Sequence, residues 1–363
     1  MRPLKSGKRV IRVSEDRIEC QSCVRCGAGS CCRLRLIDRW AGMENCVVEF
    51  RTFHNTDPPE ILKLWHASNL GPRAAEGFPC DIFELFVFSQ PFFDRKGFFV
   101  AHEGDCIVGF AHAGFTCTKD GGSLSKTDGV LSALVVHPEF RRRGIGTQLV
   151  GLAESYLAGK GATSIVVGAG LDRNGFFNGI YGGLQASGFA NEVAPWVEFL
   201  KPLKYRPGSG TRILHRDLTT GRDPVSARLI RHRRRMNLVI TDRVADMSWW
   251  WHVRFGQLDA LKFELQERSD ETVVASGQII GLDVYIPKWG VRAVGMKDVW
   301  VPEEVRRHGY GFSLVLEVCR RLREQSIQVI EAQVDADNAA AYELFTDARF
   351  EQVQELVTFR REL

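Results

Sequence analysis

The sequence predicts an α/β (α+β) protein in which one domain occurs twice. The stretch Leu131–Gly146, LSALVVHPEFRRRGIG, reads as an apolar strand, a short basic turn and two glycines that open a helix. The stretch Val299–Gly311, VWVPEEVRRHGYG, repeats that order and aligns with the first copy without a gap. Two copies about one domain length apart indicate a duplicated domain rather than a solenoid. A predicted hairpin precedes each copy: Gly97–His102 with Cys106–Phe115, and Ala260–Gln266 with Thr272–Ile280.

The remaining elements of the first domain follow from local signals. Proline and capping signals predict helices, apolar runs predict strands, and clustered glycine and serine predict a loop. In chain order we expect strand Val47–Phe53, helix Pro59–Ser68, short helix Asp81–Phe88, polar loop Lys119–Asp128, strand Val130–Val136, the motif helix to about Ala158, strand Ser164–Gly168 and a closing strand Trp196–Leu200.

A segment rich in proline and glycine separates the two copies. Lys201–Gly210, KPLKYRPGSG, predicts a linker, which we place at 204–210, and Thr211–Leu214 then opens the second domain. The basic run Arg231–Arg235 is interpreted as a solvated helix face. The tryptophans Trp249–Trp251 indicate core or inter-domain packing. The alternative is that they wall a substrate pocket between the domains.

Charge is unevenly distributed along the 363 residues, whose formal net charge is +4. Residues 1–40 contain ten Lys and Arg against four Asp and Glu, so they carry about +6 and the remainder about −2. The nearly neutral remainder argues against a nucleic-acid partner. No apolar run approaches the ~20 residues that span a bilayer, and the N-terminus lacks the apolar region of a secretory signal. We therefore expect no membrane partner and a cytoplasmic protein with reduced thiols.

Five of the ten cysteines lie in the first 42 residues. The spacing Cys20-x-x-Cys23-x-x-Cys26 is compatible with a zinc or iron–sulfur site. Against this, Cys31 comes one position late for a ferredoxin-type run, no proline follows, and no second ligand pair appears downstream. We predict a disordered basic extension over residues 1–42 and assign no metal ligands. Metal analysis of the purified protein separates the two interpretations.

The basic turn of the first copy is predicted to bind an anion. Backbone N–H groups at a helix N-terminus lack intrahelical partners, the helix dipole is positive there, and glycines let a phosphate approach the backbone. Arg141, Arg142 and Arg143 add charge at the same place. The spacing excludes a P-loop, because no lysine follows either glycine, and a Rossmann turn, because Leu149 stands where a third glycine is needed. A pyrophosphate is the expected ligand.

The run Arg141-x-x-Gly144-x-Gly146 follows a strand that ends in Val135-Val136-His137-Pro138. This combination resembles the acetyl-CoA signature of the GNAT N-acetyltransferase superfamily, and the resemblance extends from about Met43 onward. It implies two tandem domains, each a mixed, mostly antiparallel sheet flanked by helices. It also implies acetyl-CoA as the acyl donor, held in the first domain by Leu134, Val135, Val136, Arg141, Arg142, Arg143, Gly144, Ile145, Gly146, Thr147 and Asn174, and in the second by Arg306, Gly309 and Gly311.

The resemblance further implies a proton donor. In the GNAT pattern a tyrosine on the helix after the fifth strand commonly protonates the departing thiolate, and an asparagine often precedes it by seven residues. The segment Asn174–Ser187 supplies Asn174 and Tyr181 at this spacing, whereas the second copy supplies Asn338 and Phe345. Because phenylalanine cannot donate a proton, we assign Tyr181 as the catalytic acid and the first domain as the catalytic one. The alternative is that Tyr181 is a core tyrosine.

The identity of the general base stays open. The GNAT pattern often places an acidic residue on the fourth strand, where the first copy has Ala133 and the second has Asp298. Asp128, His112 and Ser132 are the first-domain candidates, and an ordered water is the default. Asp298 favours instead a tandem enzyme that works through its C-terminal copy.

The sequence thus predicts a tandem GNAT protein with domains at 43–203 and 211–363. The first domain would transfer an acetyl group from acetyl-CoA to a primary amine of a small molecule or peptide. The second would be a degenerate copy that supports the fold, lines the acceptor site or binds CoA without turnover. The alternatives are a non-catalytic acyl-CoA-binding or scaffold protein, and a mycothiol-synthase-like enzyme acting through its C-terminal domain. We expect a monomer or a homodimer.

Overall fold

The computed structural model describes residues 48–190, 194–220, 223–242 and 247–363. The predicted basic extension over residues 1–42, with the candidate metal ligands Cys20, Cys23 and Cys26, lies outside these residues. Among the helices of the described part, none is long and apolar enough to cross a membrane.

The strands form one sheet. They are β1 (Glu49–Thr52), β2 (Phe98–Glu103), β3 (Cys106–Cys117), β4 (Leu124–Val136), β5 (Ser164–Val167), β6 (Phe189–Ala190), β7 (Arg206–Asp217), β8 (Met236–Thr241), β9 (Ala260–Glu267), β10 (Val273–Gly281), β11 (Ala293–Trp300), β12 (Val329–Asp335) and β13 (Glu351–Glu362). Their order is β1-β2-β3-β4-β5-β13-β7-β12-β11-β10-β9-β8, with β6 paired to β13 outside this path. The pairs β4–β5 and β11–β12 are parallel, whereas the other pairings are antiparallel. The predicted mixed, mostly antiparallel sheet is therefore confirmed.

Helices cover both faces of this sheet. They are α1 (Pro58–Ala67), α2 (Cys80–Phe83), α3 (Ile145–Gly159), α4 (Ala194–Leu200), α5 (Ala227–Arg235), α6 (Trp249–Phe255), α7 (Ile286–Trp289), α8 (Tyr310–Glu324) and α9 (Ala339–Asp347). A π-helical turn, η1 (Glu84–Phe88), continues α2, and 3-10 turns occur at η2 (Arg95–Gly97), η3 (Pro138–Phe140), η4 (Asp283–Tyr285) and η5 (Glu303–Val305).

The sheet carries two lobes of the same plan. We call residues 48–200 the first lobe and residues 206–350 the second lobe. In the first lobe α1 and η1 pack over an aromatic core on one face of β3, and α3 covers the other face, where Ile145 and Leu149 lie against Gly109. In the second lobe α8 supplies the core residues Leu314, Val315 and Leu316. Each lobe therefore has its own helix after its parallel strand, as the duplication predicts.

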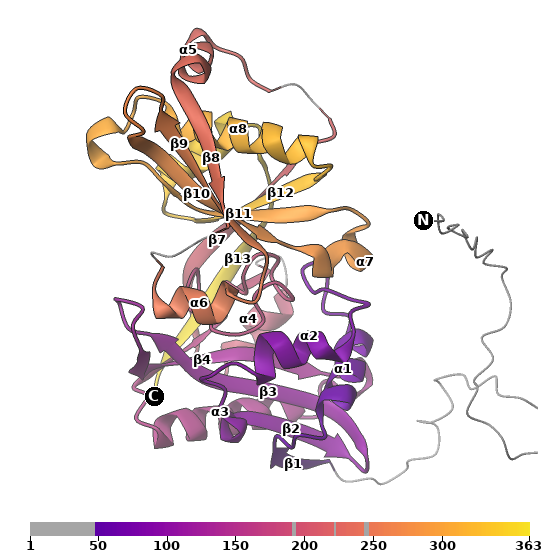
Figure 1. Cartoon of the computed structure of the whole chain (residues 1–363). Coiled ribbons are helices and arrows are strands. Elements are labelled where there is room, and N and C mark those ends of the chain that lie inside the picture. Colours follow the sequence, from indigo (N-terminus) through magenta and orange to yellow (C-terminus); the bar gives the residue numbers. More distant parts are fainter. Residues whose placement is uncertain (1–47, 191–193, 221–222, 243–246) are drawn as a thin grey trace, which may run out of the picture. The chain divides into compact units, whose positions relative to one another are not determined.

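The C-terminal strand connects the two lobes within the sheet. Figure 1 shows β13, in yellow, beside β7 at the middle of the molecule. β13 pairs with β5 of the first lobe through Phe359–Glu362, and with β7 of the second lobe on its other side. Residues 206–210 therefore form the beginning of β7 rather than a flexible linker, because the backbone of β13 supplies their hydrogen-bond partners. The domain limits themselves stay a prediction.

Several local predictions differ from the structure. The segment Asn174–Ser187, for which the GNAT resemblance implies a helix, folds as successive turns, because Gly179, Gly182 and Gly183 adopt positive φ. The strand predicted at Trp196–Leu200 is the helix α4; an apolar run this short has no period that separates the two structures. The predicted loop Lys119–Asp128 is shorter, because pairing of β4 with β3 begins at Leu124.

Candidate functional site

The glycine turn of the first lobe connects β4 to α3. η3 is followed by Arg142 in the left-handed region, with φ 64°, and by Gly144, with φ 82°, which is the N-cap of α3. Within the described residues, the backbone N–H groups from Arg142 to Thr147 have no hydrogen-bond acceptor. Arg142, Gly144 and Thr147 are exposed, so these donors face solvent. The turn therefore offers a row of free donors at the positive end of a helix dipole.

Space in front of this turn is open. A Cβ built on Gly144 meets no atom within 4 Å, whereas a Cβ on Gly146 would lie 3.3 Å from the ring of Phe199 in α4. An anion can thus reach the backbone at Gly144, while Phe199 and Val136 border the site beside Gly146. This geometry fits the predicted phosphate site.

The three arginines of the turn have different surroundings. The Arg141 guanidinium donates to the carbonyl oxygens of Val136, at 3.0 Å, and Ser68, at 2.7 Å, so it ties the end of β4 and the end of α1 to the turn. Arg143 lies 4.8 Å over the ring of Phe140. Arg142 is exposed with a backbone conformation that turns the chain. Arg141 acts through the shape of the turn, and Arg142 and Arg143 supply the solvent-facing charge.

One edge of β4 is unpaired next to the turn. β4 pairs with β5 only from Asp128 to Leu131. From Ser132 to Val136 the described residues place a strand only on the β3 side, and the pairing with β3 shifts register between Leu131 and Ala133. The predicted donor-binding residues Leu134, Val135 and Val136 therefore lie on a free strand edge that leads to the glycine turn.

Tyr181 lies on a turn rather than on a helix. It forms an isolated bridge with Ala74, and its N–H donates to Phe177 O at 2.9 Å. The Tyr181 ring lies edge-on to Trp65, with 6.2 Å between centroids, in the aromatic core that also contacts Ala133 of β4. Burial raises the pKa of the phenol and Arg73 opposes that shift, so the hydroxyl is protonated at neutral pH. Within the described residues, its hydroxyl makes no hydrogen bond to the protein.

Asn174 is buried and shapes the same segment. Its side-chain oxygen accepts from Phe176 N at 3.0 Å, and its amide donates to Ala186 O at 3.3 Å. These bonds close the 174–187 segment on itself. The side chain therefore holds the segment in place rather than pointing to the glycine turn.

The candidate bases occupy unlike places. Asp128 accepts from Ser125 Oγ at 2.9 Å and lies in β4 eight residues before Val136, about 26 Å from it at the usual strand rise. His112 is fully buried against the rings of Phe93, Phe98 and Phe176, and burial lowers its pKa to about 3. Ser132, at the register shift of β4, lies nearest to the free edge among the three. This arrangement removes Asp128 and His112 as direct bases.

The turn of the second lobe has the same backbone but different neighbours. Arg306 donates to Val301 O at 3.1 Å, as Arg141 does to Val136, and Gly309 has φ 85°. A Cβ on Gly309 would lie 2.9 Å from Arg228 Cδ and 3.8 Å from His232 Cε1. These side chains belong to α5, so α5 borders the second turn where the first turn is open.

The second lobe also lacks a hydroxyl at the position of Tyr181. Phe345 is buried in the core of the second lobe beside Phe350, and Asn338 caps α9 by accepting from Ala341 N at 3.0 Å. Asp298 has φ 52° and forms an ion pair with Lys297 at 2.6 Å. The lobes therefore share a backbone plan while their reactive side chains differ.

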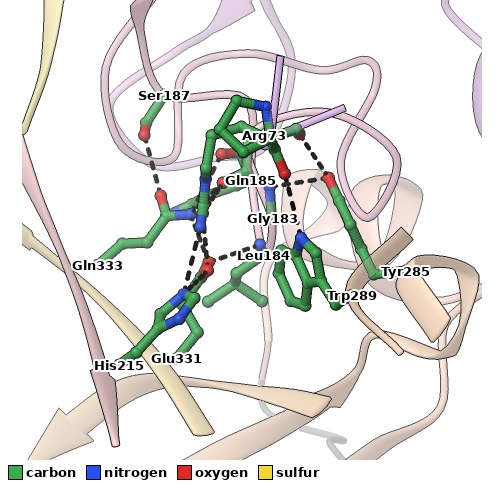
Figure 2. Close-up of polar contacts among 12 residues, drawn as sticks. Arg73, Gly183, Leu184, Gln185, Ser187, His215, Tyr285, Trp289, Glu331 and Gln333 are labelled. Atoms are coloured by element: carbon green, nitrogen blue, oxygen red, sulfur yellow. Dashed lines mark hydrogen bonds and ion pairs between the residues drawn. The ribbon is translucent and has the colours of Figure 1, made fainter. Parts of the chain in front are cut away.

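A buried polar cluster joins the lobes, and sequence reasoning missed it (Figure 2). Glu331 of β12 is fully buried and accepts from Arg73 Nη2 at 2.6 Å and from Leu184 N at 2.9 Å. His215 Nε2 lies 2.9 Å from the same carboxylate. Burial alone would raise the pKa of Glu331, but Arg73 and His215 outweigh it and hold the pKa at about 2. The only signal in the sequence was an acidic residue inside the apolar strand VIEAQVD.

No group of three His, Cys, Asp or Glu side chains that could hold a metal ion occurs among the described residues.

Family and structural comparisons with known proteins indicate the same fold. A family model described as the acetyltransferase (GNAT) family matches residues 60–175 and 241–349. No curated protein matches the sequence. Among solved structures, a tandem GNAT protein from the clavulanic acid biosynthesis pathway is 17% identical with a TM-score of 0.60, over 87% of this chain and 98% of that one. A GCN5-related N-acetyltransferase from Sphaerobacter thermophilus is 14% identical with a TM-score of 0.57, over 87% and 95%. At these identities the likeness concerns the fold.

Proposed function

Because the chain belongs to the GNAT family of acetyltransferases, we propose that it transfers an acetyl group from acetyl-CoA to a primary amine, and that the first lobe carries out the reaction. The observation that carries this proposal is the open turn at Gly144, with free N–H groups from Arg142 to Thr147. It continues into the free edge of β4, so a site for a diphosphate leads directly to a strand that can hold a thioester arm.

Different residues of the first lobe have different roles in acyl transfer. The thioester supplies an activated acetyl carbon. The amides of the turn bind the diphosphate oxygens, and Arg142 and Arg143 add attraction for the negative charge. The free edge of β4 offers backbone hydrogen bonds that align the thioester with the incoming amine.

Tyr181 supplies the proton for the departing thiolate. Its raised pKa keeps the phenol protonated at neutral pH, and its hydroxyl has no protein acceptor in the described part of the chain. An ordered water takes the proton of the amine, because Asp128 lies on the part of β4 that is paired with β5, away from its free edge, and His112 is enclosed by aromatic rings. The acceptor itself is a small molecule or peptide that carries a primary amine.

Asymmetry between the lobes supports the choice of the first. The second lobe has Phe345 in place of a phenol, and Arg228 and His232 stand beside Gly309. We propose that the second lobe supports the first and does not turn over. In the rival arrangement, with a catalytic C-terminal lobe, the Arg228 side chain would have to shift before a diphosphate could reach the backbone at Gly309.

The experiment is to incubate the purified protein with acetyl-CoA and a panel of amines and to detect the free thiol, with acetyl-CoA binding measured by calorimetry. Amine-dependent thiol release supports the proposal. Binding without release with every amine would favour a non-catalytic acyl-CoA-binding protein. Failure to bind both acetyl-CoA and CoA would remove the proposal.

A further inference from the structure

The position of Tyr181 depends on a short backbone bridge. Ala75 N donates to Ile180 O at 2.8 Å, and Gly182 N donates to Arg73 O at 2.8 Å. These two bonds hold Tyr181 opposite Ala74. Because no helix carries Tyr181, the segment 73–75 sets where its phenol lies.

The hydroxyl of Tyr285, in the second lobe, forms hydrogen bonds to both segments of this bridge. Tyr285 Oη accepts from Gly183 N at 2.8 Å and donates to Arg73 O at 3.0 Å (Figure 2). The Tyr285 side chain is fully buried, and its ring stacks on Trp289 with 4.3 Å between centroids. Its hydroxyl therefore has a fixed place, and it reaches the chain on either side of Tyr181.

The carboxylate of Glu331 holds the same two segments through different atoms. One oxygen accepts from Arg73 Nη2 at 2.6 Å and the other from Leu184 N at 2.9 Å. Arg73 also donates to Gly182 O. Side-chain atoms of Arg73 and Glu331 fill the space where Gly183 would carry a Cβ, so the chain passes closely over this ion pair.

We propose that Tyr285 and Glu331 are positioning residues for Tyr181, so that the second lobe sets the geometry of the proton donor in the first. This inference rests on the proposed function for the role of Tyr181. A proton donor must lie within hydrogen-bond reach of the departing atom, and a displacement of about 1 Å costs about 100-fold in rate. The second lobe thereby contributes to turnover without a catalytic residue of its own.

The test compares Tyr285→Phe with Tyr205→Phe. Tyr285→Phe removes the bridging hydroxyl and keeps the ring on Trp289. Tyr205 is also a buried tyrosine, and its hydroxyl donates to Glu154 at 2.9 Å, away from the bridge, so it controls for the loss of a hydrogen-bonded phenol hydroxyl elsewhere in the fold. We expect Tyr285→Phe to lower kcat at least about tenfold with an unchanged KM for acetyl-CoA, and Tyr205→Phe to leave both unchanged. Glu331→Gln, in a folded variant, should likewise lower kcat and leave the KM for acetyl-CoA unchanged.

A second readout does not depend on turnover. 3-Fluorotyrosine incorporated in place of Tyr181 allows the pKa of this phenol to be measured by 19F NMR. In Tyr285→Phe this pKa should shift toward the ordinary phenol value, whereas in Tyr205→Phe it should not change. If Tyr285→Phe matches Tyr205→Phe in the NMR titration, the proposal is overturned. An unchanged kcat in an active protein overturns it as well. If the wild-type protein releases no thiol with any amine, the proposed function fails, and the NMR comparison alone decides the positioning role.

Discussion

Phe359, near the end of the chain, pairs with Val167 at the end of β5, so the last strand completes the sheet of the first lobe. Phe359 and its neighbour Leu356 in β13 are both 2% exposed. The proposed active lobe therefore depends on residues that follow the whole second lobe in sequence. Activity and stability of the two lobes should respond together to changes in β13.

Truncation of Phe359 tests this dependence. Phe359→Ala should lower the free energy of unfolding by about 3–5 kcal/mol, because a buried aromatic ring is removed from the sheet core. Urea unfolding followed by far-UV circular dichroism measures the change. Val353→Ala is the control on the same strand: Val353 is 49% exposed, and its loss should change the free energy of unfolding by less than about 0.5 kcal/mol. Equal midpoints for the two variants would contradict the role of β13.

Gly144→Ala should weaken acetyl-CoA binding. The new Cβ would stand in the open space where a phosphate approaches, and at φ 82° a side chain also strains the backbone by about 1–2 kcal/mol. We expect Kd to rise at least about tenfold by calorimetry. Gly309→Ala places the same strain in the second-lobe turn and should leave Kd unchanged. The reverse pattern would assign donor binding to the second lobe.

Tyr181→Phe should lower kcat by about 100-fold or more, since a general acid contributes about 10²–10⁴ in rate. The Kd for acetyl-CoA should stay the same, because Tyr181 lies on a turn apart from the free amides. Tyr156→Phe is the control, as the Tyr156 hydroxyl donates to Asp94 at 2.9 Å on the other side of the sheet from the aromatic core. Steady-state thiol release separates the two. A wild-type kcat in Tyr181→Phe would leave Tyr181 as a core tyrosine.

His112→Leu should stabilise the protein at acidic pH and leave kcat unchanged. Both ring nitrogens of His112 are buried without a partner in the described residues, and burial lowers its pKa from 6.5 to about 3. Between those two pH values the unfolded chain therefore binds a proton at His112 that the folded chain does not bind. As the pH falls below 6.5, the free energy of unfolding decreases by up to about 1.4 kcal/mol per pH unit. Urea unfolding between pH 7 and 5 should show that the free energy of unfolding decreases less with falling pH in His112→Leu than in the wild-type protein. A drop in kcat would restore His112 as a base.

Glu331→Gln should remove a second acid-dependent contribution. The folded pKa of about 2 lies below the ordinary value of 4.5, so the ion pair stabilises the fold fully above pH 4.5 and loses this effect as pH falls toward 2. In the variant we expect the unfolding free energy at pH 7 to fall by about 3–5 kcal/mol, as for other broken buried pairs, and its decline below pH 4.5 to weaken. Thermal unfolding across this pH range measures both effects. An unchanged decline would show that another group titrates.

Local chemistry was enough to predict the duplicated plan. The strand, basic turn and glycine pair at Leu131–Gly146 and Val299–Gly311 specify a strand followed by a helix with little help from distant residues, because turn glycines and apolar periodicity act over a few positions. The hairpins and motif helices follow from the same short-range signals. The resemblance to the GNAT family rested on these segments, and the family match confirms it.

Contacts between distant residues decided the rest. Nothing near Lys201–Gly210 indicates that β13, more than a hundred residues later, pairs with its second half and makes it a strand. Arg73, Glu331 and Tyr285 likewise lie far apart in the sequence, so no local pattern indicates that they come into contact. The sequence by itself determined the two turns, since their donors are backbone groups of consecutive residues. Only the tertiary structure decided that Arg228 borders Gly309 while Gly144 is open, because side-chain packing between separate elements cannot be read from either element alone.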